Sequence, residues 1–147
     1  MTTKEAYILL GRPKTMQREI DRLKERREAL WLSCFPGAIR YDTDRVKSSP
    51  SDKLPERFAE IDEIDRRIVE LTTRRQELLR SLYLRMIDET PCCREMAFLH
   101  RYYFDGQSMG FIAERFGVTY QHCFRIRRKA VELFAELATK EGWEFDV

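Results

Sequence analysis

Apolar residues recur every three or four positions over a long stretch of the chain, residues 54–89. The positions that share this spacing, with one basic residue among them, are Phe58, Ile61, Ile64, Ile68, Leu71, Arg75, Leu78, Leu82 and Met86. The spacing places these side chains along one face of an α-helix. A helix of this length would extend for about 52 Å at 1.5 Å per residue. Because so long a helix needs packing partners over most of its length, the stretch predicts a helix in contact with other helices.

A second stretch with the same spacing precedes it, over about residues 14–34. Its repeating positions are Met16, Ile20, Leu23, Arg27, Leu30 and Cys34. Pro13 suits the first turn of this helix, and Pro36 with Gly37 would end it. Residues 5–10 predict a separate short helix before it. We expect the two long helices to form an antiparallel hairpin of the coiled-coil type.

The segment between the long helices, residues 36–53, is rich in proline, glycine and serine and predicts a long loop. A flexible connector is the simpler interpretation. Arg40, Arg45 and Lys47 leave open an accessory contact to nucleic acid or to a partner. The first helix should cover only part of the apolar stripe on the second. Uncovered apolar surface of this size predicts an oligomer, and a homodimer is the simplest form.

The rest of the composition also favours an all-α protein. The 147 residues include six glycines and five prolines, and 35% of them are charged, but no strand-like alternation stands out. Thr90 and Pro91 predict a boundary between a helical hairpin over residues 1–89 and a second domain over residues 90–147. The net charge is only +2, so an argument for nucleic-acid binding depends on where the basic residues gather.

The basic residues gather in a segment with the layout of a helix-turn-helix, residues 108–134. Ser108 suits the cap of its first helix, Gly117 the turn, and Thr119 the cap of its second helix. Small and apolar residues fall on the faces where the two helices would meet: Ile112, Ala113, Phe116, Val118, Cys123 and Ile126. A helix over residues 92–104 would complete a three-helix domain, and the last helix should end near Lys140.

The second helix of this motif carries the candidate DNA-binding residues. They are Thr119, Tyr120, Gln121, His122, Phe124, Arg125, Arg127, Arg128 and Lys129. Gln121 suits an adenine edge and Arg125 a guanine edge, while aromatic rings can pack on thymine methyl groups. Arg127 and Lys129 flank this face and suit contacts to phosphate, which orient the protein without reading sequence. A solvated basic face without a ligand is the alternative.

The motif resembles region 4 of bacterial sigma factors, both in the run from Gly106 to Thr119 and in the run from Arg125 to Leu133. The layout of the whole chain is similar to that of small phage transcriptional regulators of the ArpU/RinA type. This resemblance implies a DNA-binding regulator of phage or prophage origin. Sigma factors often carry charged residues where this chain has Tyr120 and Phe124, so their promoter preference does not transfer.

The sequence thus favours a sequence-specific regulator of transcription that binds double-stranded DNA, with RNA polymerase as a further candidate partner. The alternative is a coiled-coil protein that binds polymerase or another protein without reading DNA. No Ser-His-Asp set, phosphate-binding glycine loop or metal-ligand spacing of the four cysteines occurs, so we expect no enzymatic activity, metal or cofactor. Without a signal peptide or an apolar membrane span, the sequence predicts a cytoplasmic protein.

Overall fold

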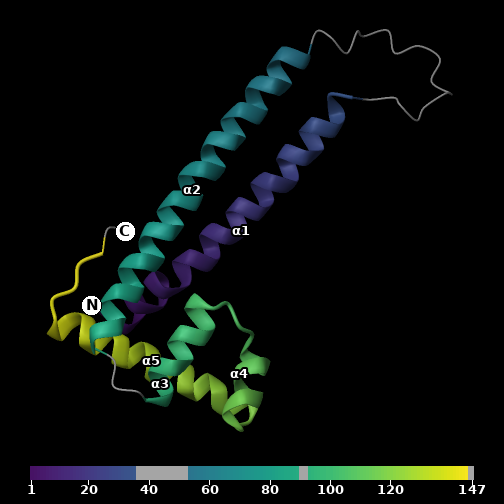
Figure 1. Ribbon diagram of the computed structural model, residues 1–147. Helices are drawn as coiled ribbons and strands as arrows, with labels where there is room; N and C mark the ends of the chain where they lie inside the picture. The colour runs from purple at the N-terminus through teal and green to yellow at the C-terminus, as the bar shows by residue number, and fades with distance from the viewer. Residues whose placement is uncertain (36–52, 90–92, 146–147) are drawn as a thin grey trace. The chain divides into compact units, whose positions relative to one another are not determined.

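The computed structural model describes residues 1–35, 53–89 and 93–145, and these residues are helical without any strand, as the sequence predicts (Figure 1). The elements in chain order are α1 (Thr3–Ser33), α2 (Leu54–Glu89), α3 (Arg94–Leu99), the π-helical turn η2 (His100–Phe104), α4 (Met109–Phe116) and α5 (Tyr120–Lys140). Most of the expected loop, residues 36–52, lies outside the described residues, and so do Cys92 and the expected boundary at Thr90 and Pro91.

The chain divides into two compact units, and both long helices contribute to each of them. The hairpin unit is Met16–Arg74, and the C-terminal unit joins Met1–Thr15 to Arg75–Val147. This division differs from the expected boundary near residue 90. The reason is that apolar residues from the first turns of α1 and the last turns of α2 lie in the same core as α3, α4 and α5. They are Ala6, Leu9, Leu10, Leu78, Leu82 and Met86.

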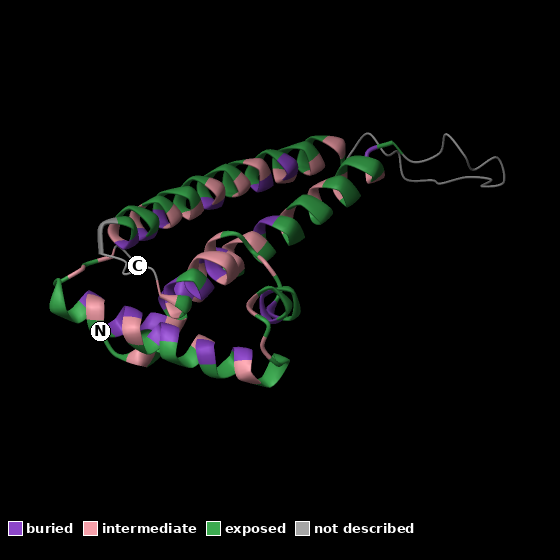
Figure 2. Ribbon diagram, turned by 60° about the horizontal axis from the view of Figure 1, so that its bottom comes forward, coloured by how far each residue is buried: buried purple, intermediate pink, exposed green. Residues whose placement is uncertain are grey.

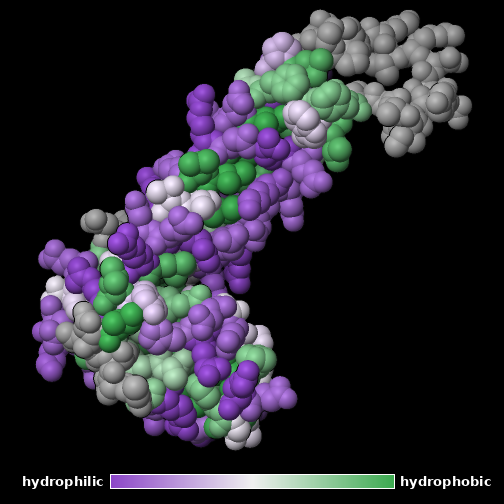
Figure 3. Space-filling view, in the orientation of Figure 1, coloured by the Kyte–Doolittle hydropathy of each residue, from purple (hydrophilic) through white to green (hydrophobic). Residues whose placement is uncertain are grey.

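Within the hairpin unit, α1 and α2 pack side by side in opposite directions, which confirms the expected hairpin (Figure 1). The polar contacts across the pair confirm the direction. Arg57 donates to the carbonyl of Ser33, Arg26 pairs with Glu60, and Arg67 pairs with Glu19. The buried residues of this unit are Ile20, Cys34, Ile61, Ile64 and Leu71. Figure 3 shows apolar side chains along the hairpin with hydrophilic side chains on both sides.

Acidic residues in the first half of α2 pair with arginines of the hairpin unit. Glu60 pairs with Arg26, and Asp65 accepts a hydrogen bond from Arg27 across the two helices. Glu63 pairs with Arg66 one turn along α2. Arg27, which interrupts the apolar spacing of α1, thus directs its charge to a carboxylate at the edge of the hairpin, and this hydrogen bond raises the pKa of its guanidinium.

The expected start of the first long helix is wrong, because α1 is continuous from Thr3 and contains Pro13 in its interior. Thr2 and Glu5 form a capping box: the N–H of Glu5 donates to the Thr2 hydroxyl at 3.2 Å, and the N–H of Thr2 donates to the Glu5 carboxylate at 2.7 Å. This cap starts the helix well before Pro13. Proline removes one helical hydrogen bond, but Pro13 is buried, and its carbonyl accepts a hydrogen bond from Arg75 at 3.2 Å.

Most of the apolar stripe of α2 is buried within one chain, although the sequence predicts that the first helix covers only part of it. Ile61, Ile64 and Leu71 are buried in the hairpin unit, and the last three positions of the stripe are buried in the C-terminal unit. The coverage is possible because α1 has 31 residues rather than the shorter helix expected. Phe58, at the start of the stripe, is 40% exposed. The dimer therefore stays a prediction from the sequence.

The expected helix over residues 92–104 is shorter and ends in a different geometry. It begins at Arg94 as α3 and continues as η2, where the N–H of Asp105 bonds to the carbonyl of His100 at 2.9 Å. Met96, Phe98, Leu99 and Tyr103 of this segment are buried, whereas Phe104 is only partly buried.

Residues 143–145 pack on α5. Gly142, with a φ of 63°, follows the last turn of the helix, and the rings of Trp143 and Phe145 lie 5.8 and 6.3 Å from the ring of Phe134. Of the helices in the described residues, none is both long and apolar enough to span a membrane.

Candidate nucleic-acid interface

The segment from Ser108 to Lys140 folds as a short helix, a tight turn and a long helix. The Ser108 hydroxyl caps α4 by accepting from the N–H of Phe111, and the Thr119 hydroxyl caps α5 by accepting from the N–H of His122 at 3.1 Å. Gly117 lies between the helices with a φ of 63°, the left-handed geometry that favours glycine. Caps and turn all agree with the expectations from the sequence.

The faces where α4 and α5 meet are apolar and closely packed. Ile112 and Ala113 of α4 are buried, and so are Cys123 and Ile126 of α5. The Cys123 thiol points at the backbone of α4 and lies 3.8 Å from the carbonyl oxygen of Met109. Burial raises the pKa of this thiol. The packing fixes which residues of α5 remain on the outside.

The outer face of the first three turns of α5 carries most of the predicted site residues. Exposed residues of this face are Tyr120, Gln121, Phe124, Arg125, Arg128 and Lys129, and Thr119 is exposed beside them. We call the six residues on the helix the outer face of α5. Figure 2 shows how buried and exposed residues alternate along the helices of the C-terminal unit. His122, which was also predicted to contact DNA, is half-buried.

Two aromatic side chains stand at one end of this outer face. The rings of Tyr120 and Phe124 meet edge to face with 5.1 Å between their centroids. Tyr120 is 56% exposed and Phe124 is 45% exposed, although aromatic side chains of this size are usually buried. On α4, the guanidinium of Arg115 lies 5.4 Å from the ring of Phe111, which is also exposed. The exposed surfaces of α4 and α5 thus combine apolar groups with cations.

The charge of this face is uncompensated. In the described parts of the chain, no carboxylate pairs with Arg125, Arg128 or Lys129. Acidic residues begin one turn later on the same helix, at Glu132 and Glu136. An anionic ligand would therefore meet attraction along the first turns of α5 and repulsion beyond them.

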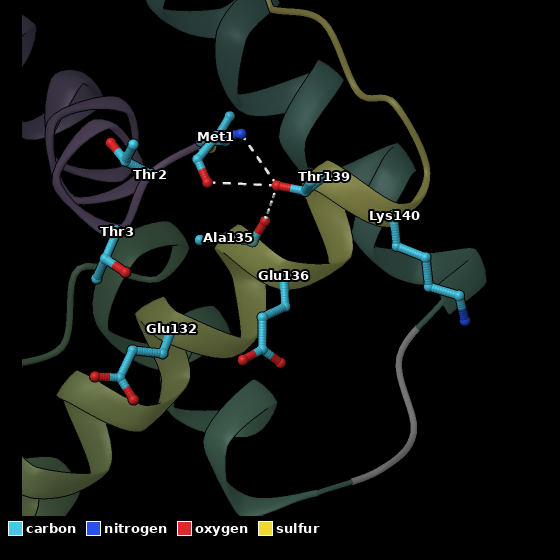
Figure 4. A pocket seen from close by; sticks show the side chains of 8 residues that line it. All are labelled: Met1, Thr2, Thr3, Glu132, Ala135, Glu136, Thr139 and Lys140. Atoms are coloured by element: carbon cyan, nitrogen blue, oxygen red, sulfur yellow. Dashed lines mark hydrogen bonds between the residues drawn. The ribbon is translucent and has the colours of Figure 1, made fainter.

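Glu132 and Glu136 line a broad pocket of about 750 Å³, together with Thr139, Lys140, Ala135 and the first residues of the chain (Figure 4). Thr139 accepts a hydrogen bond from the Met1 amino group at 3.0 Å. The two carboxylates make this pocket unsuited to a phosphate group. We therefore place the candidate site on the outer face of α5.

Arg127, which the sequence predicts as a flanking phosphate contact, also contacts three tyrosines. Its Nε donates to the hydroxyl of Tyr103 at 3.2 Å, and its guanidinium carbon lies 5.5, 5.1 and 5.9 Å from the rings of Tyr7, Tyr102 and Tyr103. Burial lowers the pKa of Arg127, but the hydrogen bond to Tyr103 and the nearby tyrosines raise it by more. Sequence spacing alone could not show this cluster, because Tyr7 lies at the opposite end of the chain.

The capping hydroxyl of Thr119 should contribute measurably to stability. We expect Thr119→Ala to lower the free energy of unfolding by about 1 kcal/mol, because the first turn of α5 loses a partner for one N–H group. Thr119→Ser should restore most of the loss. Urea denaturation followed by Trp143 fluorescence in a Trp31→Phe background would check both variants. An alanine variant as stable as the original chain would contradict the assignment of the cap.

Comparison with protein-family models, with curated proteins and with solved structures finds no match for this chain. The resemblance to sigma region 4 and to the ArpU/RinA type thus remains a prediction from the sequence. Among the described residues, no three His, Cys, Asp or Glu side chains come close enough together to hold a metal ion.

Proposed function

We propose that this protein is a sequence-specific DNA-binding regulator of transcription that inserts the first turns of α5 into the major groove. The single observation that carries the proposal is the outer face of α5: exposed amide, guanidinium and aromatic groups on a helix whose inner face is locked against α4. The major groove of B-DNA is wide enough to admit one α-helix, and it displays a different pattern of groups for each base pair.

The chemistry of the outer face supports reading of bases. Gln121 and Arg125 are one turn apart and fully outside the packing with α4. A glutamine amide can bond both N6 and N7 of adenine, and a guanidinium can bond both O6 and N7 of guanine. Tyr120 and Phe124 add an apolar edge suited to thymine methyl groups. Arg128 and Lys129 lie further along the helix and suit phosphates at the rim of the groove.

The position of the acidic residues supports an approach by the beginning of α5. Glu132 and Glu136 would face the phosphate backbone if the whole helix lay in the groove, and that contact would be repulsive. An approach in which the N-terminal turns of α5 enter the groove keeps these carboxylates away from DNA. Recognition helices of helix-turn-helix proteins dock in this way.

Selection of bound molecules from a pool of randomised duplexes tests the proposal. We expect the enriched pool to contain a common motif of a few base pairs. The motif should include a G·C pair that Arg125 contacts and an A·T pair that Gln121 contacts. A palindrome with half-sites about one helical turn apart would indicate a dimer, and a single half-site a monomer. A pool without any motif would reject sequence-specific reading.

The exposed aromatic residues also support a second candidate function, which is binding of a protein partner. Phe111, Tyr120 and Phe124 would also suit a protein partner such as a subunit of RNA polymerase, since interfaces are enriched in aromatic residues and arginine. If this chain bound no duplex but formed a stable complex with RNA polymerase, that result would favour the second candidate function.

A further inference from the structure

One tyrosine ring in the C-terminal unit lies close to cations from two different helices. The ammonium nitrogen of Lys14, from α1, is 3.4 Å from the centre of the Tyr102 ring. The guanidinium carbon of Arg127, from α5, is 5.1 Å from the same ring. Phe98 stacks on Tyr102 with 5.4 Å between centroids, which fixes the orientation of the ring. The ring therefore gathers two positive charges from segments far apart in the sequence.

Aromatic rings hold these two cations without neutralising them. A ring attracts a cation through its quadrupole and carries no net charge. Nowhere in the described residues does a carboxylate pair with Lys14 or Arg127. Burial raises the pKa of Tyr103, so the hydroxyl that accepts from Arg127 stays neutral at physiological pH. Both full positive charges remain available to an anion.

Both side chains also keep unused hydrogen-bond donors. Arg127 uses only its Nε toward Tyr103, and its two terminal nitrogens carry four further N–H groups. The Lys14 ammonium has three N–H groups and contacts a ring rather than an acceptor. Both residues are half-buried, so solvent and ligands can reach them. Two uncompensated cations with free donors around one ring suit a phosphate group.

We infer that Lys14 and Arg127 bind one phosphate group of the DNA backbone beside the groove that α5 enters. The inference rests on the proposed function. Arg127 follows Phe124 by almost one turn of α5, so its side chain lies on the aromatic side of the outer face. The backbone that borders the groove on that side would pass this site. Lys14 then extends the DNA contact to α1, outside the helix-turn-helix itself.

The salt dependence of binding separates a phosphate contact from a structural role. A plot of log K against log salt concentration has a negative slope, and each phosphate contact that is lost should reduce the magnitude of this slope by about 0.9. We expect a decrease of up to this size for Lys14→Gln, because Arg127 still faces the same phosphate, on both the enriched and a scrambled duplex, with the preferred motif unchanged. Lys14→Arg keeps the cation and should retain the slope. Lys4, an exposed lysine on the same helix, provides the matched control Lys4→Gln, which should bind like the original chain.

A loss of stability would not imitate this result, because it lowers the amount of folded protein and leaves the slope unchanged. Should Lys14→Gln unfold at a lower temperature, Lys14→Met keeps a long side chain on the Tyr102 ring and removes the charge. An unchanged slope in these variants, while Arg125→Ala loses its base preference, would overturn the inference and leave the proposed function standing. Absence of any duplex binding by the unmodified chain would overturn both.

Discussion

Replacing Arg125 with alanine should weaken binding to the enriched duplex by about 1–3 kcal/mol, or roughly 5- to 150-fold. Arg125 is exposed on the first turns of α5 and forms no ion pair within the described residues, so its guanidinium is free to bond a base edge. The substitution removes two hydrogen bonds to one base and leaves the packing with α4 untouched. Binding should therefore weaken on the preferred duplex far more than on a scrambled one.

The measurement is a titration of both duplexes by fluorescence anisotropy, at one salt concentration and then over a range. Arg125→Ala should relax the preference at one base pair of the motif. The matched control is Lys129→Ala on the same helix, which should weaken both duplexes equally and lower the salt slope by about one. Equal behaviour of the two variants on the two duplexes would show that the outer face of α5 does not read bases.

Replacing Phe134 with alanine should lower the free energy of unfolding of the C-terminal unit by about 3–5 kcal/mol. Phe134 is 0% exposed, and its ring contacts both Trp143 and Phe145. Truncation would leave a cavity at the place where the end of the chain docks on α5. Because the same helix carries the outer face, loss of this core should also abolish DNA binding at temperatures where the original chain is folded.

Phe124→Ala provides the matched control for this variant. Phe124 lies on the same helix but is 45% exposed, so its removal should change stability by no more than about 0.5 kcal/mol. Trp143 fluorescence in a Trp31→Phe background would report unfolding of the C-terminal unit alone, since Trp31 belongs to the hairpin unit. Equal destabilisation by Phe134→Ala and Phe124→Ala would contradict the core described above.

Local patterns in the sequence were sufficient to predict most of the helices and the motif. The bounds of α2 follow from the regular spacing of its apolar residues, and the caps at Ser108 and Thr119 follow from side chains that satisfy the first N–H groups of a helix. Gly117 follows in the same way, because a tight turn of this kind requires a positive φ. Each of these features depends on residues close together in the chain.

The errors arose where distant residues decide the structure. Pro13 seemed to start a helix, but its burial and the hydrogen bond from Arg75 keep it in the interior of α1. The early apolar residues of α1 complete the core of the C-terminal unit, so the compact units do not follow the boundary expected near residue 90. The contacts of Arg127 with rings from α1 and η2 could likewise not be predicted from the spacing of residues in the sequence. The spacing of apolar residues in the sequence shows which face of a helix is apolar. It does not show which residues cover that face.

A titration of ¹⁵N-labelled protein with the enriched duplex, followed through backbone amide signals, would show whether α5 binds DNA. Physiological or higher salt suppresses binding that depends on charge alone. We expect the largest changes in the signals at residues 119–129, with smaller changes around Lys14, and much weaker changes with a scrambled duplex at the same concentration. Signals at residues 119–129 that stay unchanged, while the duplex perturbs only the hairpin unit, would show that α5 does not bind DNA.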